Sequence, residues 1–245
     1  MFGIEGITAI EAAMIFGVMF IGTVIQASAG LGLGLIALPV LLMVDDVFIP
    51  APLAVSGIVL LSMTLWRDFS SVEWSGLKKI ALPMALGCFV GGQVLALLPQ
   101  HLVGLFFGGI ILLAVAISFG GLTINKSPLA YGIGGFLGGF MATVAAIGGP
   151  PIALLYQHDK GPVIRGTLSA IFMAVIMMSL VSLYFVGKFG VPELKAAGIL
   201  VPGVITGFII SKFSAKWLDK GKSRMAVLLI SGLSAIVLIA KSVQI

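Results

Sequence analysis

Apolar residues form long uninterrupted blocks along this chain, and polar residues are confined to the short segments between them. Four blocks contain no Asp, Glu, Lys or Arg: residues 47–66, 80–98, 102–122 and 166–186. Each is close to the roughly 20 residues that a helix needs to cross the hydrocarbon core of a bilayer. Two shorter blocks, 196–211 and 225–240, reach that length once their flanks are added. The pattern predicts a set of membrane-spanning helices.

Two further blocks, 7–44 and 128–157, are too long for one ordinary span and are interrupted by helix-breaking residues. The first interruption contains Gly30, Gly32 and Gly34, and the second contains Gly148, Gly149, Pro150 and Pro151. In a helix interior, Gly costs roughly 1 kcal/mol and Pro roughly 3 kcal/mol relative to Ala. Each block is therefore either one bent span or a re-entrant hairpin of two half-helices.

The two long blocks also mark an internal repeat. At an offset of 117 residues, Gly22 matches Gly139, Ala29 matches Ala146 and Gly32 matches Gly149. In both halves, one long broken block precedes three ordinary spans. Internal duplication is common in transporters. We therefore predict two transmembrane repeats, residues 1–125 and 126–245.

The distribution of Lys and Arg separates the two interpretations of the long blocks. If each block crosses the membrane once, the two sides receive equal numbers of basic residues. If each is a hairpin with no net crossing, one side holds only Lys188, Lys195 and Lys241. The other side then holds eleven: Arg67, Lys78, Lys79, Lys126, Lys160, Arg165, Lys212, Lys216, Lys220, Lys222 and Arg224. Short cytoplasmic loops carry the excess of basic residues, so the hairpin arrangement is favoured.

The predicted fold is therefore an all-α integral membrane protein made of two inverted repeats, each a re-entrant hairpin followed by three transmembrane helices. Three crossings per half give the halves opposite orientations, and both termini are expected outside the cytoplasm. Composition agrees with the class: of 245 residues, 60% are hydrophobic and 9% are charged, against about 25% charged in a soluble domain. The net charge of +5 is attributed to cytoplasmic loops, and no nucleic-acid partner is expected.

The hairpin tips are the candidate binding site, because irregular backbone at membrane depth survives only where it is buried in protein or lines a wet cavity. Two helix N-termini meeting there would favour an anion. The candidate residues at the tips are Gln26, Ser28, Gly30, Gly32, Gly34, Thr143, Gly148, Gly149 and Pro150. The competing interpretation is that these glycines only permit tight helix packing.

Arg165 completes the candidate set and has two equally good interpretations. It begins a span, so it is either a cytoplasmic anchor or a cation that receives an anion. Nucleotide-binding loops, HExxH motifs and Cys clusters are absent from the sequence, and no span contains an obvious acidic proton relay. ATP-driven transport and intramembrane catalysis by this chain are therefore not expected, nor is a bound metal or cofactor.

Three motifs of this chain resemble the TauE/SafE family of sulfite and organosulfonate exporters. They are Gly22-x3-Gln26-x3-Gly30-x-Gly32-x-Gly34-x4-Pro39, the later Gly148-Gly149-Pro150-Pro151 and the downstream Arg165-Gly166-Thr167. The resemblance covers nearly the whole chain. It implies a secondary transporter in the plasma membrane that exports small sulfur oxyanions or organosulfonates from the cytoplasm by alternating access. An importer of another small anion and an anion channel remain the alternatives. A homo-oligomer is compatible with either.

Overall fold

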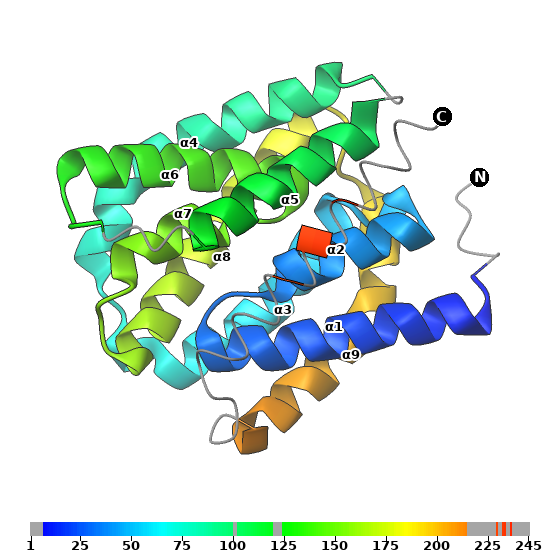
Figure 1. Cartoon of the computed structure of the whole chain (residues 1–245), viewed down its shortest axis with the longest axis horizontal. Coiled ribbons are helices and arrows are strands. Elements are labelled where there is room, and N and C mark those ends of the chain that lie inside the picture. The colour runs from blue at the N-terminus through cyan, green and yellow to red at the C-terminus, as the bar shows by residue number, and fades with distance from the viewer. Residues whose placement is uncertain are drawn as a thin grey trace.

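The computed structural model describes residues 7–99, 102–119, 124–214 and positions 229, 232, 233 and 236, and its regular elements are helices (Figure 1). The elements are α1 (Ala9–Ala29), α2 (Leu33–Val44), η2 (Asp46–Phe48), α3 (Ala51–Asp68), η3 (Phe69–Ser71), α4 (Trp74–Leu97), α5 (Val103–Phe119), α6 (Pro128–Ala145), α7 (Gly149–Ala153), η5 (Leu154–Tyr156), α8 (Gly161–Phe185) and α9 (Val191–Ser214). Within these residues, six helices are long and apolar enough to cross a membrane. The all-α membrane fold is confirmed, whereas the predicted span 225–240 lies outside the described residues apart from four positions.

The chain reverses direction at the first break. A Cβ placed on Gly22 would lie 2.9 Å from the side chain of Leu33, so the start of α2 folds back along α1. The Leu33 N–H also donates to Gln26 Oε1 at 2.8 Å across the break. Thr8 begins α1 with a capping box, in which its hydroxyl accepts from the Glu11 N–H and the Glu11 carboxylate accepts from the Thr8 N–H.

The second break reverses the chain in the same way. A Cβ on Gly138 would touch the side chain of Ile152, because α7 and η5 run back along α6 (Figure 1). Lys126, just before α6, pairs with Asp159, just after η5, at 2.7 Å, so the hairpin begins and ends at the same place. Lys126 also pairs with Glu73 at 2.8 Å. That hydrogen bond holds the pKa of Glu73 below its ordinary value.

The arms of the hairpins are unequal, which differs from the prediction of two half-helices. The first arms α1 and α6 have 21 and 18 residues, whereas α2 has 12 and α7 has five. α6 stays helical through its glycines because other helices pack closely on them. A Cβ on Gly139, for example, would strike the Met84 carbonyl oxygen of α4. The bulk of this neighbour, rather than local propensity, keeps the first arm continuous.

Each first arm packs against a helix of the other half of the chain, through equivalent residues. A Cβ on Gly87 of α4 would meet the Phe136 carbonyl oxygen of α6, and one on Gly203 of α9 would meet the Phe16 carbonyl oxygen of α1 at 2.9 Å. One turn later, Gly91 lies against Thr143 and Gly207 lies against Thr23. This is small-residue helix packing of the kind found in membrane proteins. In Figure 1, α1 and α6 run in opposite directions.

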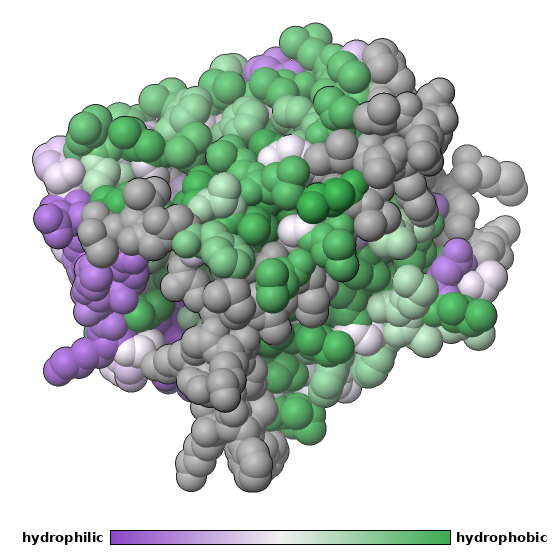
Figure 2. Space-filling view, viewed as in Figure 1, coloured by the Kyte–Doolittle hydropathy of each residue, from purple (hydrophilic) through white to green (hydrophobic). Residues whose placement is uncertain are grey.

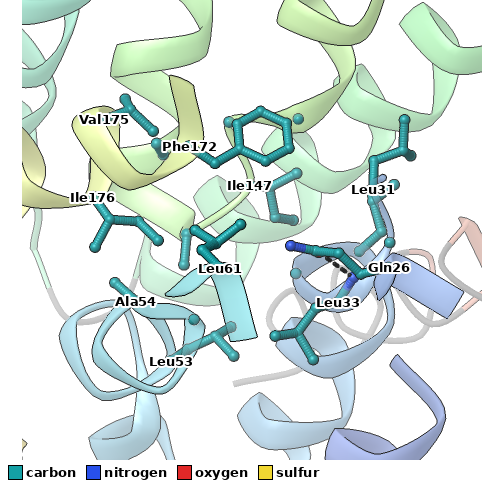
Figure 3. A pocket seen from close by; sticks show the side chains of 18 of the residues that line it. Gln26, Leu31, Leu33, Leu53, Ala54, Leu61, Ile147, Phe172, Val175 and Ile176 are labelled. Carbon is teal, nitrogen blue, oxygen red and sulfur yellow. Dashed lines mark hydrogen bonds between the residues drawn. The ribbon is translucent and has the colours of Figure 1, made fainter. Parts of the chain in front are cut away.

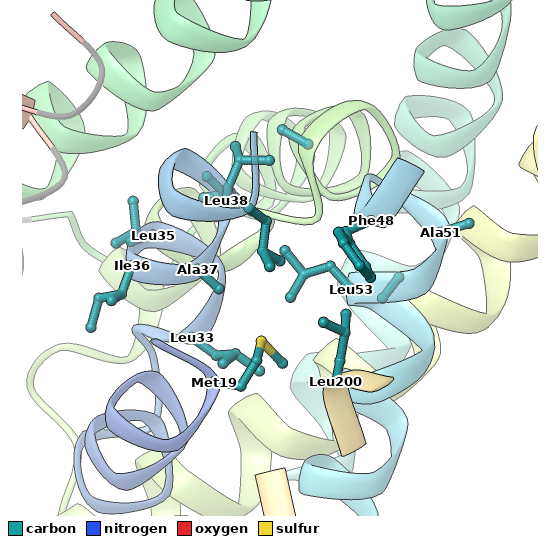
Figure 4. Packing of buried hydrophobic residues seen from close by; sticks show 14 of the residues in the cluster. Met19, Leu33, Leu35, Ile36, Ala37, Leu38, Phe48, Ala51, Leu53 and Leu200 are labelled. Carbon is teal, nitrogen blue, oxygen red and sulfur yellow. The ribbon is translucent and has the colours of Figure 1, made fainter. Parts of the chain in front are cut away.

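The short helix α2 packs mainly against α1 and also contacts η2, α5 and α3. All residues of α2 are apolar, and most of them are buried: Leu33, Leu35, Ile36, Ala37, Leu38 and Leu41. Figure 4 shows Phe48, Leu53 and Met19 on one side of α2, and Leu35 and Ile36 pointing to the other side. A helix of this length is not stable alone in water. Its position in the fold therefore depends on this packing.

Hydrophilic surface is concentrated at the ends of the molecule, and apolar surface lies between them (Figure 2). The left end in Figures 1 and 2 is where α3 ends and where α4, α6 and α8 begin. The basic residues of the described chain follow this division. Those helix ends hold Arg67, Lys78, Lys79, Lys126, Lys160 and Arg165. Lys188 lies in the connection from α8 to α9, Lys195 lies in the first part of α9, and Lys212 lies in its last turn. The assignment of the left end to the cytoplasm stays a prediction from the excess of basic residues.

Candidate functional site

The two breaks share one backbone design. In the first, α1 ends at Gly30 with φ of 90°, and Gly32 is the N-cap of α2. In the second, α6 ends at Ala146 with φ of 54°, and Gly148 is the N-cap of α7. Ala146 is the one residue other than glycine with a positive φ in the described part of the chain. It occupies the left-handed position that Gly30 fills in the first half, at a cost that glycine would avoid. The caps of the two breaks thus match at an offset of 116 residues, one less than the offset of 117 at which the sequence pairs Ala29 with Ala146.

The two breaks are in direct contact. A Cβ on Gly34 would lie 2.5 Å from the Ala146 carbonyl oxygen, and a Cβ on Gly149 would lie 3.6 Å from Leu31 Cβ. The backbone of α2 can approach the second break this closely only because position 34 has no side chain. Segments more than 100 residues apart in the sequence thus form one structural unit.

A small cavity, here called the central pocket, lies where the breaks meet (Figure 3). Its volume is about 60 Å³, several times the roughly 10–15 Å³ that a single water needs. It is lined by residues of both breaks and of α3 and α8: Gln26, Leu31, Gly32, Leu33, Gly34, Leu35, Leu53, Ala54, Gly57, Leu61, Ala142, Ala146, Ile147, Gly148, Gly149, Pro150, Phe172, Val175 and Ile176. None of these residues is charged. A ligand here would meet one polar side chain, exposed backbone and apolar walls.

Gln26 supplies that polar side chain. Its Oε1 atom accepts the Leu33 N–H at 2.8 Å and so caps the start of α2. Figure 3 shows the amide nitrogen of Gln26 pointing away from Leu33, towards the space beside Ile147 and Leu61. The side chain therefore fixes the returning helix with its acceptor and presents its donor to the central pocket.

The helix ends around the central pocket have the polarity of an anion site. The positive end of the α2 dipole begins at Gly32 and Leu33, both of which line the pocket. A helix N-terminus exposes backbone N–H groups without intrahelical partners. With the Gln26 amide and no carboxylate in the lining, the site favours an anion over a cation.

Comparison with known proteins identifies the family of the chain. The family model for the sulfite exporter TauE/SafE matches residues 14–238, which include both breaks. The chain belongs to the TauE/SafE family. It is therefore a multi-pass membrane transporter and not an enzyme. No curated protein and no solved structure matches the chain.

The structure of this TauE/SafE protein divides the predicted site residues into three groups. Six of them line the central pocket: Gln26, Gly32, Gly34, Gly148, Gly149 and Pro150. Gly30 lies outside it and ends α1 against Ile164 and Leu168 of α8. Ser28 and Arg165 line a second, neighbouring pocket. The role of each in binding stays a prediction.

Thr143 lies outside both pockets and takes part in a polar contact between helices. Its Oγ1 atom shares a 2.8 Å hydrogen bond with Ser179 Oγ of α8 and donates to the Gly139 carbonyl oxygen at 3.0 Å. Cys88 Sγ of α4 lies 3.5 Å from the same Ser179 hydroxyl. This buried cluster joins α4, α6 and α8. It fixes the first arm of the second hairpin from the side away from the cavity.

We therefore expect Thr143→Ala to lower stability while leaving anion affinity within twofold of wild type. Removing a hydrogen bond of this kind costs about 1 kcal/mol, or roughly 0.6 kcal/mol by measurements in membranes. Thermal unfolding and calorimetric titration of the purified variant measure the two effects separately, with Thr143→Ser as the control that keeps the hydroxyl. A large loss of anion affinity at unchanged melting temperature would show that Thr143 contributes to anion binding.

Asp68 is a buried charge that the sequence interpretation missed. It is the last residue of α3 and its side chain is 10% exposed. Its Oδ2 atom accepts from Arg67 and from Arg165 of α8, 97 positions further along. In the sequence, Asp68 follows Arg67 in what looks like a polar connection between helices. Its partner Arg165 is too far along the chain for the sequence to indicate that Asp68 is buried.

Proposed function

We propose that this TauE/SafE protein exports small sulfur oxyanions or organosulfonates from the cytoplasm by alternating access, with the central pocket as its substrate site. The observation that carries the proposal is the convergence of both helix breaks on one cavity. Broken helices at the interface between repeats form the substrate sites of many secondary transporters. The family supplies the sulfur chemistry, and the cavity supplies a place for a compact anion.

The size and lining of the central pocket suit an oxyanion of a few atoms. The cavity of about 60 Å³ gives room for such an ion without much bulk attached. Backbone N–H groups and the Gln26 amide are donors, and sulfite and sulfonate oxygens are acceptors. The apolar walls from α3 and α8 exclude water, which strengthens each of these hydrogen bonds.

The packing between the halves supports a rocking mechanism. α4 packs on α6 and α9 packs on α1 through equivalent glycines, so each half holds the hairpin of the other. A movement of one pair against the other would open the central pocket, which both breaks line, alternately to the two sides of the membrane. Alternating access by such rigid-body motion is typical of transporters built from repeats.

The test is transport by the purified protein in proteoliposomes. We expect saturable, counter-flow-stimulated movement of radiolabelled sulfite or of a short alkanesulfonate, and an increase in melting temperature with the same anions. Inorganic cations should give neither effect. Steady current that does not saturate with anion concentration would contradict a transporter and favour a channel.

A further inference from the structure

A second cavity lies beside the central pocket, and Arg165 is one of the residues that line it. It is here called the Arg165 pocket, and its volume is about 320 Å³. The walls are mainly apolar and include Ile25, Leu154 and Leu168. Three residues, Leu31, Leu35 and Pro150, line both cavities and separate them.

Arg165 is held in this pocket by one side of its guanidinium group. Its Nε atom donates to Asp68 Oδ2 at 3.1 Å. In the described part of the chain, the pairing of Arg165 with Asp68 goes through Nε alone, so the two terminal nitrogens are not committed to that carboxylate. The side chain of Arg165 is 23% exposed. A guanidinium fixed at Nε presents its other edge in one orientation, which suits two-pronged binding of an oxyanion.

Arg67 prevents Asp68 from cancelling the charge of Arg165. It donates to the same Oδ2 atom through Nε at 3.2 Å and Nη2 at 3.0 Å. Its Nη2 also donates to the Ala27 carbonyl oxygen of α1 at 2.8 Å, and its guanidinium lies over the Phe208 ring. Two arginines and one aspartate leave a net charge of +1. Asp68 therefore orients Arg165 while the cluster remains attractive to anions.

We propose that the Arg165 pocket is a second anion-binding site, separate from the central pocket, in which Arg165 oriented by Asp68 binds the sulfonate group and the apolar walls bind an alkyl substituent. The choice of a sulfonate as the anion rests on the proposed function, whereas the second site itself does not. Besides Arg165, the polar side chains of the lining are Ser28, Ser118 and Gln157, and the rest of the wall is apolar and too wide for a bare sulfite ion to fill. Each CH2 group of an alkyl chain that becomes buried against the apolar walls raises the binding affinity about three- to fourfold. The pocket therefore prefers alkanesulfonates, whereas the central pocket has room only for a compact ion.

The test is calorimetric titration of methanesulfonate, propanesulfonate and pentanesulfonate into protein in zwitterionic nanodiscs. Gly149→Val, which fills the central pocket, is used as a background that leaves the Arg165 pocket intact. We expect this variant to keep one site whose affinity rises with chain length. Adding Arg165→Gln should remove that site, and adding Arg165→Lys should weaken it at least tenfold although the charge is kept. The chain-length dependence should be unchanged when part of the lipid is replaced by phosphatidylglycerol.

Asp68→Asn tests the positioning role by the sign of its effect. If Asp68 only contributes charge, its removal makes the pocket more positive and raises pentanesulfonate affinity. If it orients Arg165, affinity falls, and we expect a loss of about three- to tenfold. Melting temperatures identify any variant that does not fold, in which case Arg165→Lys alone decides the matter.

Three results would overturn the second site: no binding of any sulfonate by folded Gly149→Val, equal affinity of Arg165→Lys and Arg165, or displacement of pentanesulfonate by the anionic lipid. The first would leave the central pocket as the single site. Failure of the central site gives a different outcome, namely wild-type methanesulfonate binding in Gly149→Val that Arg165→Gln removes.

Discussion

Gly149→Val is expected to abolish binding of a compact oxyanion at the central pocket while the protein still folds. A Cβ at this position has its nearest neighbours, Leu31 Cβ and Phe172 Cζ, at 3.6 Å, which is ordinary van der Waals contact. The backbone therefore tolerates a side chain. The two methyl groups of valine extend from there into a cavity of only about 60 Å³. We expect a loss of sulfite affinity of roughly a hundredfold or more, about 2.7 kcal/mol in binding free energy.

The measurement is calorimetric titration with sulfite on monodisperse protein, together with its melting temperature. Gly132→Val is the matched control, because it lies in α6 of the same hairpin and no described atom lies within 4 Å of its Cβ position. Gly149→Ala should give an intermediate loss. Gly32→Val is a poorer probe, because its φ of 143° and the Ile25 side chain at 3.0 Å predict a folding defect. Wild-type affinity in folded Gly149→Val would show that the glycines serve packing alone.

The positions of the breaks could be predicted from the sequence because they depend on local backbone chemistry. Clustered Gly and paired Pro end helices wherever they occur, and Gly30, Gly32 and Gly148 lie at helix caps in the structure. The lengths of the arms could not be predicted. Whether a glycine ends a helix also depends on its neighbours in space: Gly138 and Gly139 lie inside α6, with another helix or the returning chain against them.

The candidate site was predicted in part for the same reason. Residues that break the helix had to be near the tips, and six of the ten candidates line the central pocket. Thr143 lies outside both pockets, and distance along the sequence does not show which face of its helix meets the cavity. Its hydroxyl faces Ser179 of α8 instead. Asp68 was missed because its burial depends on Arg165, and an ion pair between distant residues has no periodic signal.

Gln26→Glu is expected to remove anion binding at the central pocket without destabilising the fold. The carboxylate can still accept the Leu33 N–H at the start of α2, where a negative charge is favourable by about 0.3–1 kcal/mol. It also replaces the donor that points into the central pocket with a negative charge (Figure 3). Two like charges about 4 Å apart repel by about 4 kcal/mol at an effective dielectric of 20. That corresponds to a loss of affinity of roughly a thousandfold.

Methanesulfonate is the suitable probe, because it stays an anion throughout the pH range and its binding therefore reports on the protein. In Gln26→Glu, binding should return as pH falls and the new carboxyl group takes up a proton, whereas wild-type binding should not change over the same range. Gln26→Met keeps the size of the side chain without charge or hydrogen bonding, and a smaller loss of about tenfold is expected, together with a lower melting temperature because the α2 cap is lost. The two substitutions thus move stability in different directions while both weaken binding. A folded Gln26→Glu protein that bound methanesulfonate like wild type at neutral pH would exclude the central pocket as the anion site, and one that gained affinity for a cation would reverse the charge assigned to its ligand.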